Sequence, residues 1–305
     1  MKTVTCLFVA LISMAAHAQT KATDVSRINN KYLDIPYAKK SAAQTLDIYL
    51  PDEGDGPFPV ILSIHGGAFK GGDKRDGQVT PMLKGLQRGY AVVSMNYRLS
   101  GEAKWPAQIH DCKTAVRWIR ANSKKYKLNP DKIAAWGSSA GGHLSALLGT
   151  SGDVKSLEDL TLGNSGQSSR VQAVIDWYGP TDFLGMDEQL KESGVENPQR
   201  HSAPSSPESE LIGKNIEDAP RLVQETTPEG YVSSDDPPFF IQHGIEDNQV
   251  PYQGSVLLAR KLGKILGYKK VSLELFPATR HGGEAFGTEE NLNKIFAFLD
   301  KFLKI

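Results

Sequence analysis

The segment Gly137–Gly141 reads GSSAG and matches the pattern G-x-S-x-G, with Ser139 at its centre. A serine hydroxyl attacks a carbonyl group only when a base removes its proton and nearby donors stabilise the resulting oxyanion. The pattern supports this chemistry when the serine lies at a sharp turn between a strand and a helix. The preceding run KIAAW favours a strand, and the following run GHLSALL favours a helix. We therefore predict that Ser139 is a nucleophile and that Ser138 faces away from the site.

A second glycine-rich segment, HGGAF at residues 65–69, follows the apolar run VILSI. Glycines at such a position let backbone amides approach a developing oxyanion closely. The helix that follows Ser139 adds further free amides at its N-terminus. The predicted oxyanion donors are the amides of Ala140, Gly66, Gly67 and Ala68, with one or two of the last three taking part. We expect His65 to hold this loop, and the alternative interpretation is a tight glycine turn with a structural histidine.

The base required by Ser139 is predicted to be His281. When a G-x-S-x-G serine belongs to a triad, the acid and then the histidine follow it along the chain. His281 lies in the loop TRHGG, directly after the strand-like run VSLELF. An imidazole at a strand end can accept the serine proton and later return it to a leaving group. We expect His143 and His243 to be scaffold residues.

The acid that orients His281 is predicted to be Asp247. It follows the strand-like run FFIQHG in the loop IEDNQVP. Its carboxylate would fix the tautomer of the histidine and stabilise the imidazolium. The sequence leaves alternatives open, which are Glu246, Asp176 and Asp182. A different carboxylate, Asp111, is expected to pair with Arg98 or Arg117.

Strand-like and helix-like runs alternate along the chain, which is typical of an α/β fold with a mainly parallel sheet. The strand-like runs cover 44–50, 60–64, 90–95, 132–136, 171–177, 239–242 and 271–276. Helical spacing of apolar residues appears over 109–119, 142–148, 258–265 and 292–302. We predict about eight strands flanked by helices. The segment 185–236, rich in Ser, Pro, Gly and Glu, is predicted to be an insertion or cap, with an unstructured surface loop as the alternative.

Composition narrows the classes of function. Among the 305 residues, Lys and Arg together number 35, and Asp and Glu together also number 35. The chain therefore lacks the excess of basic residues that would indicate a nucleic-acid partner. The Cys and His residues show no zinc-ligand spacing, and Gly71–Lys74 does not form a phosphate-binding loop. The chemistry predicted for Ser139 requires no cofactor or metal. The oligomeric state cannot be derived from this sequence.

Residues 1–18 have the layout of a secretory signal peptide. Lys2 is followed by an apolar run from Leu7 to Ile12 and by the small-x-small site Ala16–Ala18. That apolar run is too short to span a bilayer. We expect cleavage after Ala18, a catalytic domain over 19–305, and a secreted or periplasmic protein without stable membrane insertion.

The motifs HGGAF, GSSAGG, DWYGPTDF, PPFFIQHGIEDNQVP and RHGG occur in this order. In this respect the chain resembles bacterial bifunctional xylan-acetyl and feruloyl esterase-like carboxylesterases, which are close to the hormone-sensitive-lipase-like esterases. The likeness covers residues 34–305. It implies an α/β-hydrolase fold, catalytic roles for Ser139, Asp247 and His281, and plant cell-wall esters as substrates. Ala68 stands where the strict lipase pattern has a third glycine.

The resulting hypothesis is a secreted serine hydrolase of short-chain acyl or feruloyl esters, with a small-molecule or polysaccharide substrate. Trp177 and Tyr178 are candidate substrate-binding residues that could stack on sugars or aromatic acyl groups, or could equally be core residues. The main alternative is a peptidase or amidase of the prolyl-oligopeptidase or formamidase type, which uses the same three residues. A binding module on an inactive hydrolase scaffold is a third possibility.

Overall fold

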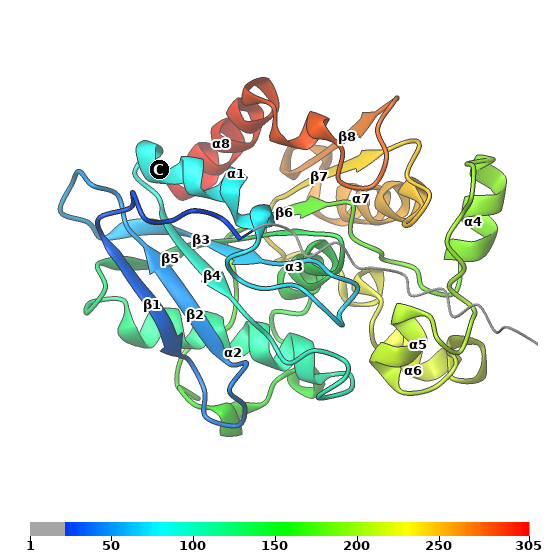
Figure 1. The fold of residues 1–305 in the computed structure, drawn as a ribbon, viewed down its shortest axis with the longest axis horizontal. Helices are drawn as coiled ribbons and strands as arrows, with labels where there is room; N and C mark the ends of the chain where they lie inside the picture. Colours follow the sequence, from blue (N-terminus) through cyan, green and yellow to red (C-terminus); the bar gives the residue numbers. More distant parts are fainter. Residues whose placement is uncertain (1–21, 305) are drawn as a thin grey trace, which may run out of the picture.

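The computed structural model describes residues 22–304, so the predicted signal peptide lies outside the described residues. An eight-stranded sheet runs through its centre (Figure 1). The strands are β1 (Lys31–Pro36), β2 (Thr45–Tyr49), β3 (Phe58–Ile64), β4 (Ala91–Met95), β5 (Leu128–Ser138), β6 (Ala173–Trp177), β7 (Phe239–Gly244) and β8 (Val271–Phe276). Their spatial order is β1-β2-β4-β3-β5-β6-β7-β8. Strands β3 to β8 are all parallel, and only β2 runs against its two neighbours. The predicted mainly parallel sheet is confirmed.

Helices cover both faces of the sheet. The α-helices are α1 (Thr80–Leu83), α2 (Ala107–Asn122), α3 (Ala140–Thr150), α4 (Met186–Ser193), α5 (Pro207–Ile212), α6 (Pro220–Gln224), α7 (Tyr252–Leu266) and α8 (Glu289–Leu303). The 3-10 helices are η1 (Gly77–Val79), η2 (Lys84–Arg88), η3 (Lys155–Leu157), η4 (Leu160–Leu162), η5 (Ile216–Asp218), η6 (Pro228–Tyr231), η7 (Tyr268–Lys270) and η8 (Glu284–Gly287).

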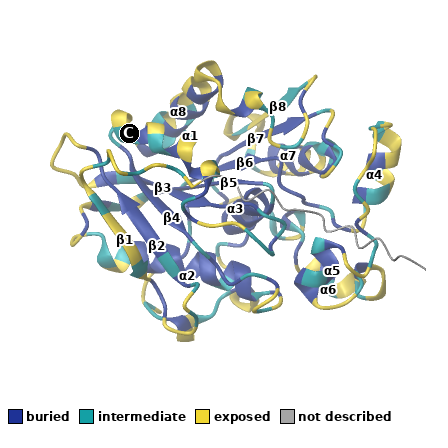
Figure 2. Cartoon of the chain, in the orientation of Figure 1, coloured by how far each residue is buried: buried dark blue, intermediate teal, exposed yellow. Residues whose placement is uncertain are grey.

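The strands supply two separate apolar cores because successive side chains point to opposite faces. Val60 and Leu62 of β3 join the core that contains residues of α2, α3 and α7. Ile61, between them, joins the core that contains residues of α1 and α8. The central strands are consequently buried along their length (Figure 2). This burial on both faces explains why their sequences are apolar runs rather than alternating patterns.

Three elements of the N-terminal part of the fold were absent from the sequence prediction. Strand β1 was not predicted, because it lies at the sheet edge, is largely exposed and contains Asp34 at φ 55°. The short helices α1 and η2 were not predicted either, because each spans only about one turn. The segment 185–236, which we call the insertion, lies between β6 and β7 and contains α4, α5, η5, α6 and η6. Its role as a cap stays a prediction.

No helix within residues 22–304 combines the length and apolar character needed to cross a bilayer.

The carboxyl ends of β3, β5, β7 and β8 meet at one edge of the sheet because these strands are parallel. The loops that leave these ends carry residues 65–69, Ser139, Asp247 and His281, respectively. The topology therefore places four segments that are far apart in the sequence along one edge. The sequence order of the predicted triad matches this placement.

A buried ion pair fastens α2 to the edge of the sheet. Asp111 on α2 is fully buried, and its Oδ1 and Oδ2 accept hydrogen bonds from Nη2 and Nε of Arg98 at 2.8 and 2.9 Å. The backbone amide of Arg98 and the side chain of Gln44 donate to the same carboxylate, at 2.9 and 2.7 Å. The predicted partner of Asp111 is therefore Arg98. Arg117 instead contacts Glu158 and the backbone of Asp159.

We predict that Asp111→Ala lowers the free energy of unfolding by about 3–5 kcal/mol, because the buried Arg98 guanidinium loses its countercharge. Urea denaturation followed by circular dichroism measures this change. Asp55→Ala is the matched control, since Asp55 is exposed, and it should leave the unfolding midpoint unchanged. A loss below about 1 kcal/mol for Asp111→Ala would contradict the structural role assigned to the pair.

Candidate active site

Ser139 occupies a strained turn between β5 and α3. Its backbone has φ 55° and ψ −124°, a conformation that L-residues adopt rarely. The turn closes only because its flanks are glycines. A Cβ on Gly137 would lie 2.2 Å from the carbonyl oxygen of Gly141, and one on Gly141 would lie 2.0 Å from that of Ile64. The geometry is that of a nucleophile elbow, which exposes the hydroxyl of Ser139 at the sheet edge.

A continuous chain of hydrogen bonds joins the three side chains predicted as nucleophile, base and acid. The Oγ of Ser139 lies 2.9 Å from Nε2 of His281. The Nδ1 of His281 lies 2.7 Å from Oδ2 of Asp247. Because Asp247 can only accept when ionised, Nδ1 carries the proton and Nε2 is free to accept from the serine. The structure therefore brings these three predicted residues together in the tautomer that proton removal from Ser139 requires.

Asp247 is 1% exposed, yet its surroundings favour the ionised form. Its Oδ1 accepts hydrogen bonds from the backbone amides of Gln249 and Val250 at 2.8 and 2.9 Å. Its Oδ2 faces His281 and also Nε2 of His243, at 3.3 Å. Burial acts to raise the pKa of Asp247, but the hydrogen bonds from His243 and His281 outweigh it and hold that pKa below its usual range.

The other acids considered from the sequence lie elsewhere. Glu246 is exposed. Asp176 accepts a hydrogen bond from the amide of Gly179 at 3.0 Å, and burial raises its pKa to about 6. Asp182 accepts from the side chain of Gln189 at 2.9 Å. Among the described residues, Asp247 is the carboxylate that bonds to His281.

Of the four backbone amides predicted as candidate oxyanion donors, one is already bonded to another group. The amide of Gly66 donates to Oε1 of Gln78 at 2.8 Å and is therefore not free. The amides of Gly67 and Ala68 donate to no other group within residues 22–304, and the amide of Ala140 lies at the open N-terminus of α3. Gly67, Ala68 and Ala140 remain the donor candidates. Ala68 adopts φ 55° despite its Cβ.

No motif in the sequence indicates the polar network that supports this loop. Oε1 of Gln78 accepts from the amide of Gly66 and from the hydroxyl of Ser138. The Nε2 of Gln78 donates to Oδ2 of Asp76 at 2.9 Å. Gln78 therefore connects the loop after β3 with the residue before Ser139. It lies in a helical turn with no motif around it, so only the structure identifies it.

Histidines of the scaffold have the expected roles, with one addition. His65 stacks on Tyr97, with ring centroids 4.4 Å apart, and its Nδ1 bonds the carbonyl of Gly66. His143 is buried against Phe183, and this burial lowers its pKa to about 4. The addition is His243, which contacts the carboxylate of Asp247. Its position at the end of β7, four residues before Asp247, was the available signal.

Of the two roles considered for Trp177, substrate binding and core packing, its burial favours the core. Its side chain is 3% exposed, its Nε1 donates to Gln242 at 2.7 Å, and its ring packs edge-on against Trp136. Tyr178 is also buried, at 8% exposed, and its ring lies edge-on to His281 with centroids 4.7 Å apart. Tyr178 can therefore support the imidazole, whereas Trp177 belongs to the core.

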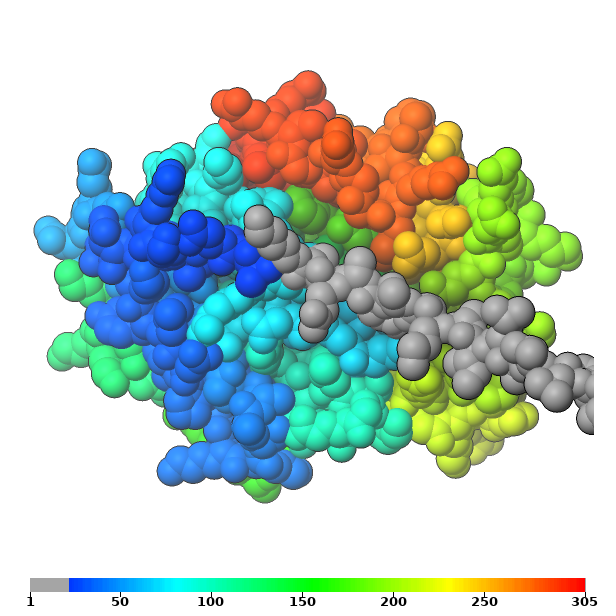
Figure 3. Space-filling view, in the orientation of Figure 1, coloured from blue at the N-terminus to red at the C-terminus, as the bar shows by residue number. Residues whose placement is uncertain are grey.

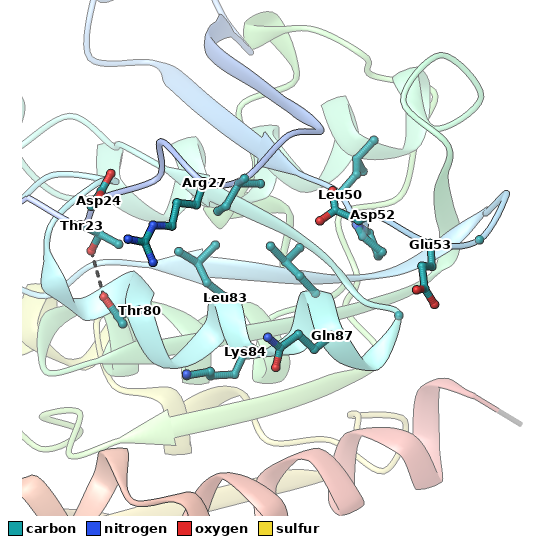
Figure 4. A pocket seen from close by; sticks show the side chains of 15 residues that line it. Thr23, Asp24, Arg27, Leu50, Asp52, Glu53, Thr80, Leu83, Lys84 and Gln87 are labelled. Carbon is teal, nitrogen blue, oxygen red and sulfur yellow. Dashed lines mark hydrogen bonds between the residues drawn. The ribbon is translucent and has the colours of Figure 1, made fainter.

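Two cavities differ in whether the loops of the candidate triad line them. One of about 450 Å³ is lined by Glu246, Asn248 and Arg280 from the acid and histidine loops and by residues 193–196 of the insertion. Another of about 890 Å³ lies between residues 23–28, the loop after β2, and α1 with η2 (Figure 4). None of the candidate catalytic residues lines the second cavity. Within residues 22–304, no group of three or more His, Cys, Asp or Glu side chains could hold a metal ion.

The sheet order, the elbow at Ser139 and the hydrogen-bonded chain to Asp247 define an α/β-hydrolase with a Ser-His-Asp constellation. Comparison with known proteins is more specific. The BD-FAE family profile matches residues 46–262, and the chain belongs to that family.

Similar proteins include esterase LipQ of Mycobacterium tuberculosis, which is 32% identical over 84% of this chain and 58% of its own length. A solved bifunctional GH43-CE protein of Bacteroides eggerthii superimposes with a TM-score of 0.81 and 34% identity, covering 90% of this chain and 35% of that one. A truncated carbohydrate esterase from gut microbiota gives a TM-score of 0.80 and 31% identity, covering 93% of this chain and 100% of that one. The chain spans 57–60% of the length of three similar mycobacterial proteins, LipM, LipQ and LipC.

We predict that Gly141→Ala lowers the free energy of unfolding by about 1–3 kcal/mol, since its Cβ must displace the backbone of Ile64. Thermal unfolding measures this loss. Gly166→Ala is the matched control, because a Cβ there meets nothing within 4 Å and the residue does not have a positive φ. Equal stability of both variants would show that the elbow tolerates a side chain at residue 141.

Proposed function

We propose that this protein is a serine carboxylic ester hydrolase that acts through an acyl-enzyme. The observation that carries the proposal is the chain from Ser139 through His281 to the buried carboxylate of Asp247. Relatives named as esterases and carboxylic ester hydrolases support it. No metal or cofactor is required by the steps below.

Each step follows from the positions of these atoms. Nε2 of His281 removes the proton from Ser139 as Oγ attacks the ester carbonyl carbon. The carbonyl oxygen becomes an oxyanion, which the amide of Ala140 and an amide of the 67–68 segment can stabilise. The intermediate then collapses, the C–O bond to the alcohol breaks, and His281 returns the proton to the alcohol oxygen. His281 then deprotonates a water molecule, whose oxygen attacks the acyl carbon. The bond to Oγ of Ser139 breaks, and His281 returns the proton to Oγ as the acid leaves.

The substrates we propose are short-chain acyl or feruloyl esters of plant polysaccharides. Three observations support this choice. The chain belongs to the BD-FAE family, and two similar solved proteins are described as a carbohydrate esterase and a bifunctional GH43-CE protein. In addition, Glu246, Asn248 and Arg280 line the cavity beside the triad loops. Such polar side chains can form hydrogen bonds with sugar hydroxyls.

We also propose that the protein is secreted or periplasmic, because residues 1–18 have the three parts of a signal peptide. A polymeric substrate outside the cytoplasm fits this location. N-terminal sequencing of exported protein should find Gln19 as the first residue. Export with Met1 retained would contradict the proposal.

We predict that Ser139→Ala and Asp247→Asn reduce kcat for p-nitrophenyl acetate by on the order of 10³-fold or more, because the first removes the nucleophile and the second no longer holds His281 in the required tautomer. Steady-state hydrolysis measures both. Ser168→Ala is the matched control, since Ser168 is exposed on a remote loop, and it should retain wild-type kcat. Unchanged hydrolysis by Ser139→Ala would refute the mechanism.

We predict that acetylated xylan and methyl ferulate are hydrolysed with higher kcat/KM than p-nitrophenyl octanoate, because the polar lining beside the triad does not favour a long alkyl chain. An ester panel with acetyl, butyryl and octanoyl model substrates measures the ratio. A short peptide-amide panel is run in parallel. Preference for the octanoyl ester would contradict the proposed substrate class, and faster cleavage of the amides would favour a peptidase or amidase.

A further inference from the structure

The insertion contains a buried histidine that contacts acceptors with both ring nitrogens. His201 is 1% exposed. Its Nδ1 lies 2.9 Å from Oε2 of Glu208, on α5, and its Nε2 lies 2.7 Å from the carbonyl oxygen of Gln249. A carbonyl oxygen and an ionised carboxylate can only accept hydrogen bonds. With Glu208 ionised, both contacts are satisfied together only when both nitrogens carry protons, so this arrangement indicates an imidazolium.

The second acceptor belongs to the loop that carries the catalytic acid. The amide of Gln249 donates to Oδ1 of Asp247 at 2.8 Å, while its carbonyl accepts from His201. The same peptide segment is thus bonded on one side to the insertion and on the other to Asp247. Oδ2 of Asp247 then bonds His281, which bonds Ser139. An unbroken chain of contacts runs from Glu208 to the nucleophile.

Further contacts hold residues 196–202 of the insertion against this loop. The side-chain amide of Asn248 donates to the carbonyls of Glu196 and Asn197 at 3.1 and 3.2 Å. The carboxylate of Asp187, on α4, accepts from the amides of His201 and Ser202 at 2.6 and 3.0 Å. In Figure 3 the insertion, in yellow-green, adjoins the gold and orange segments that follow it in the chain. His201 therefore has a fixed position between α4, α5 and the acid loop.

We propose that His201, as a buried imidazolium held by Glu208, is a positioning residue that fixes the acid loop and thereby orients Asp247 towards His281. This inference rests on the proposed function, because it assigns a purpose to the insertion in the same reaction. It gives His201 and Glu208 of the insertion a role in aligning the triad. Loss of one imidazolium proton leaves an acceptor facing an acceptor at one of the two contacts, which weakens the link from Glu208 through His201 to the acid loop.

The charge on His201 makes this alignment dependent on pH. The charged groups that face its ring are Glu208 on α5 and Asp187 on α4, whereas Asp247 on the acid loop faces His281 and His243 instead. Burial acts to lower the pKa of His201, but the hydrogen bond and charge of Glu208 outweigh it and raise that pKa above its ordinary value. A raised pKa in the folded state means that the link is complete at pH values below about 6.5 and is lost as pH rises through the raised pKa.

The experiment compares Glu208→Gln with wild type, using Glu217→Gln as the control because Glu217 is exposed in the same insertion. The glutamine still offers an oxygen to Nδ1 but removes the charge. Histidine ¹⁵N spectra recorded from acid to alkaline pH report the protonation of His201, and the low-field Nδ1 proton of His281 reports its bond to Asp247. The kcat for p-nitrophenyl acetate is measured over the same range.

We expect wild-type His201 to be protonated on both nitrogens at neutral pH, and its deprotonation to shift the Nδ1 proton signal of His281. In Glu208→Gln the His201 transition moves to lower pH. The ratio of its kcat to that of wild type is close to one at pH values below both His201 transitions and falls by on the order of tenfold between the two transitions, because a misplaced acid loop misaligns the triad. Glu217→Gln matches wild type in every measurement.

A neutral His201 in the wild-type protein at neutral pH would overturn the proposal. So would a His201 titration that leaves both the His281 signal and the kcat ratio unchanged, because that result assigns His201 a purely structural contact. The wild-type titration alone decides this if Glu208→Gln does not fold. Wild-type protein that hydrolyses no ester would refute the proposed function, while the His281 signal would still decide whether His201 positions the acid loop.

Discussion

The carboxylate of Asp247 is the group on which the proposed chemistry depends, because it must stay ionised while it is almost completely buried. An isolated buried carboxylate would take up a proton, since burial disfavours the charged form. Here two backbone amides bond one oxygen, and His281 and His243 face the other. These donors fix the position of the carboxylate as well as its charge. The tautomer of His281, and with it the basicity available to Ser139, follows from that ionised state.

The parallel direction of the strands brings Ser139, Asp247 and His281 together. Parallel strands end at one edge of the sheet, so loops separated by more than a hundred residues meet there. Close packing at that edge requires glycines at 137 and 141, where any Cβ would strike the backbone. The backbone strain at Ser139 and Ala68 lies at the same edge. Strain of this kind persists only where surrounding contacts determine the conformation, which is common at sites of catalysis.

The sequence predicted those parts of the site whose signals are local or ordered along the chain. Ser139 stands in a motif with a strand before it and a helix after it, and Asp247 and His281 follow in the order that a parallel sheet imposes. The sheet itself could be predicted because its central strands are buried on both faces and are therefore apolar. Strand β1 escaped prediction because it is exposed at an edge, where pairing with β2 rather than apolar character defines it.

Residues that act through long-range polar contacts could not be identified from the sequence. Gln78 accepts a hydrogen bond from the amide of Gly66 and another from Ser138, which is 60 residues away in the sequence. His201 contacts the carbonyl of Gln249 and lies in a segment with almost no apolar pattern. Neither has a neighbouring motif, and a single polar side chain has many possible partners. Trp177 was a candidate both for substrate binding and for the core, because an aromatic beside a motif can take either role. Its indole instead pairs with Gln242 in the core, a contact that depends on the register of β6 against β7.

The most direct test of the account is to treat the protein with a fluorophosphonate and locate the adduct by peptide mass spectrometry. We expect a single stoichiometric phosphonyl group on Ser139, formed at a rate that falls sharply when Asp247 is replaced by asparagine. Absence of an adduct, or an adduct on Ser138 or another serine while Ser139 stays free, would contradict it.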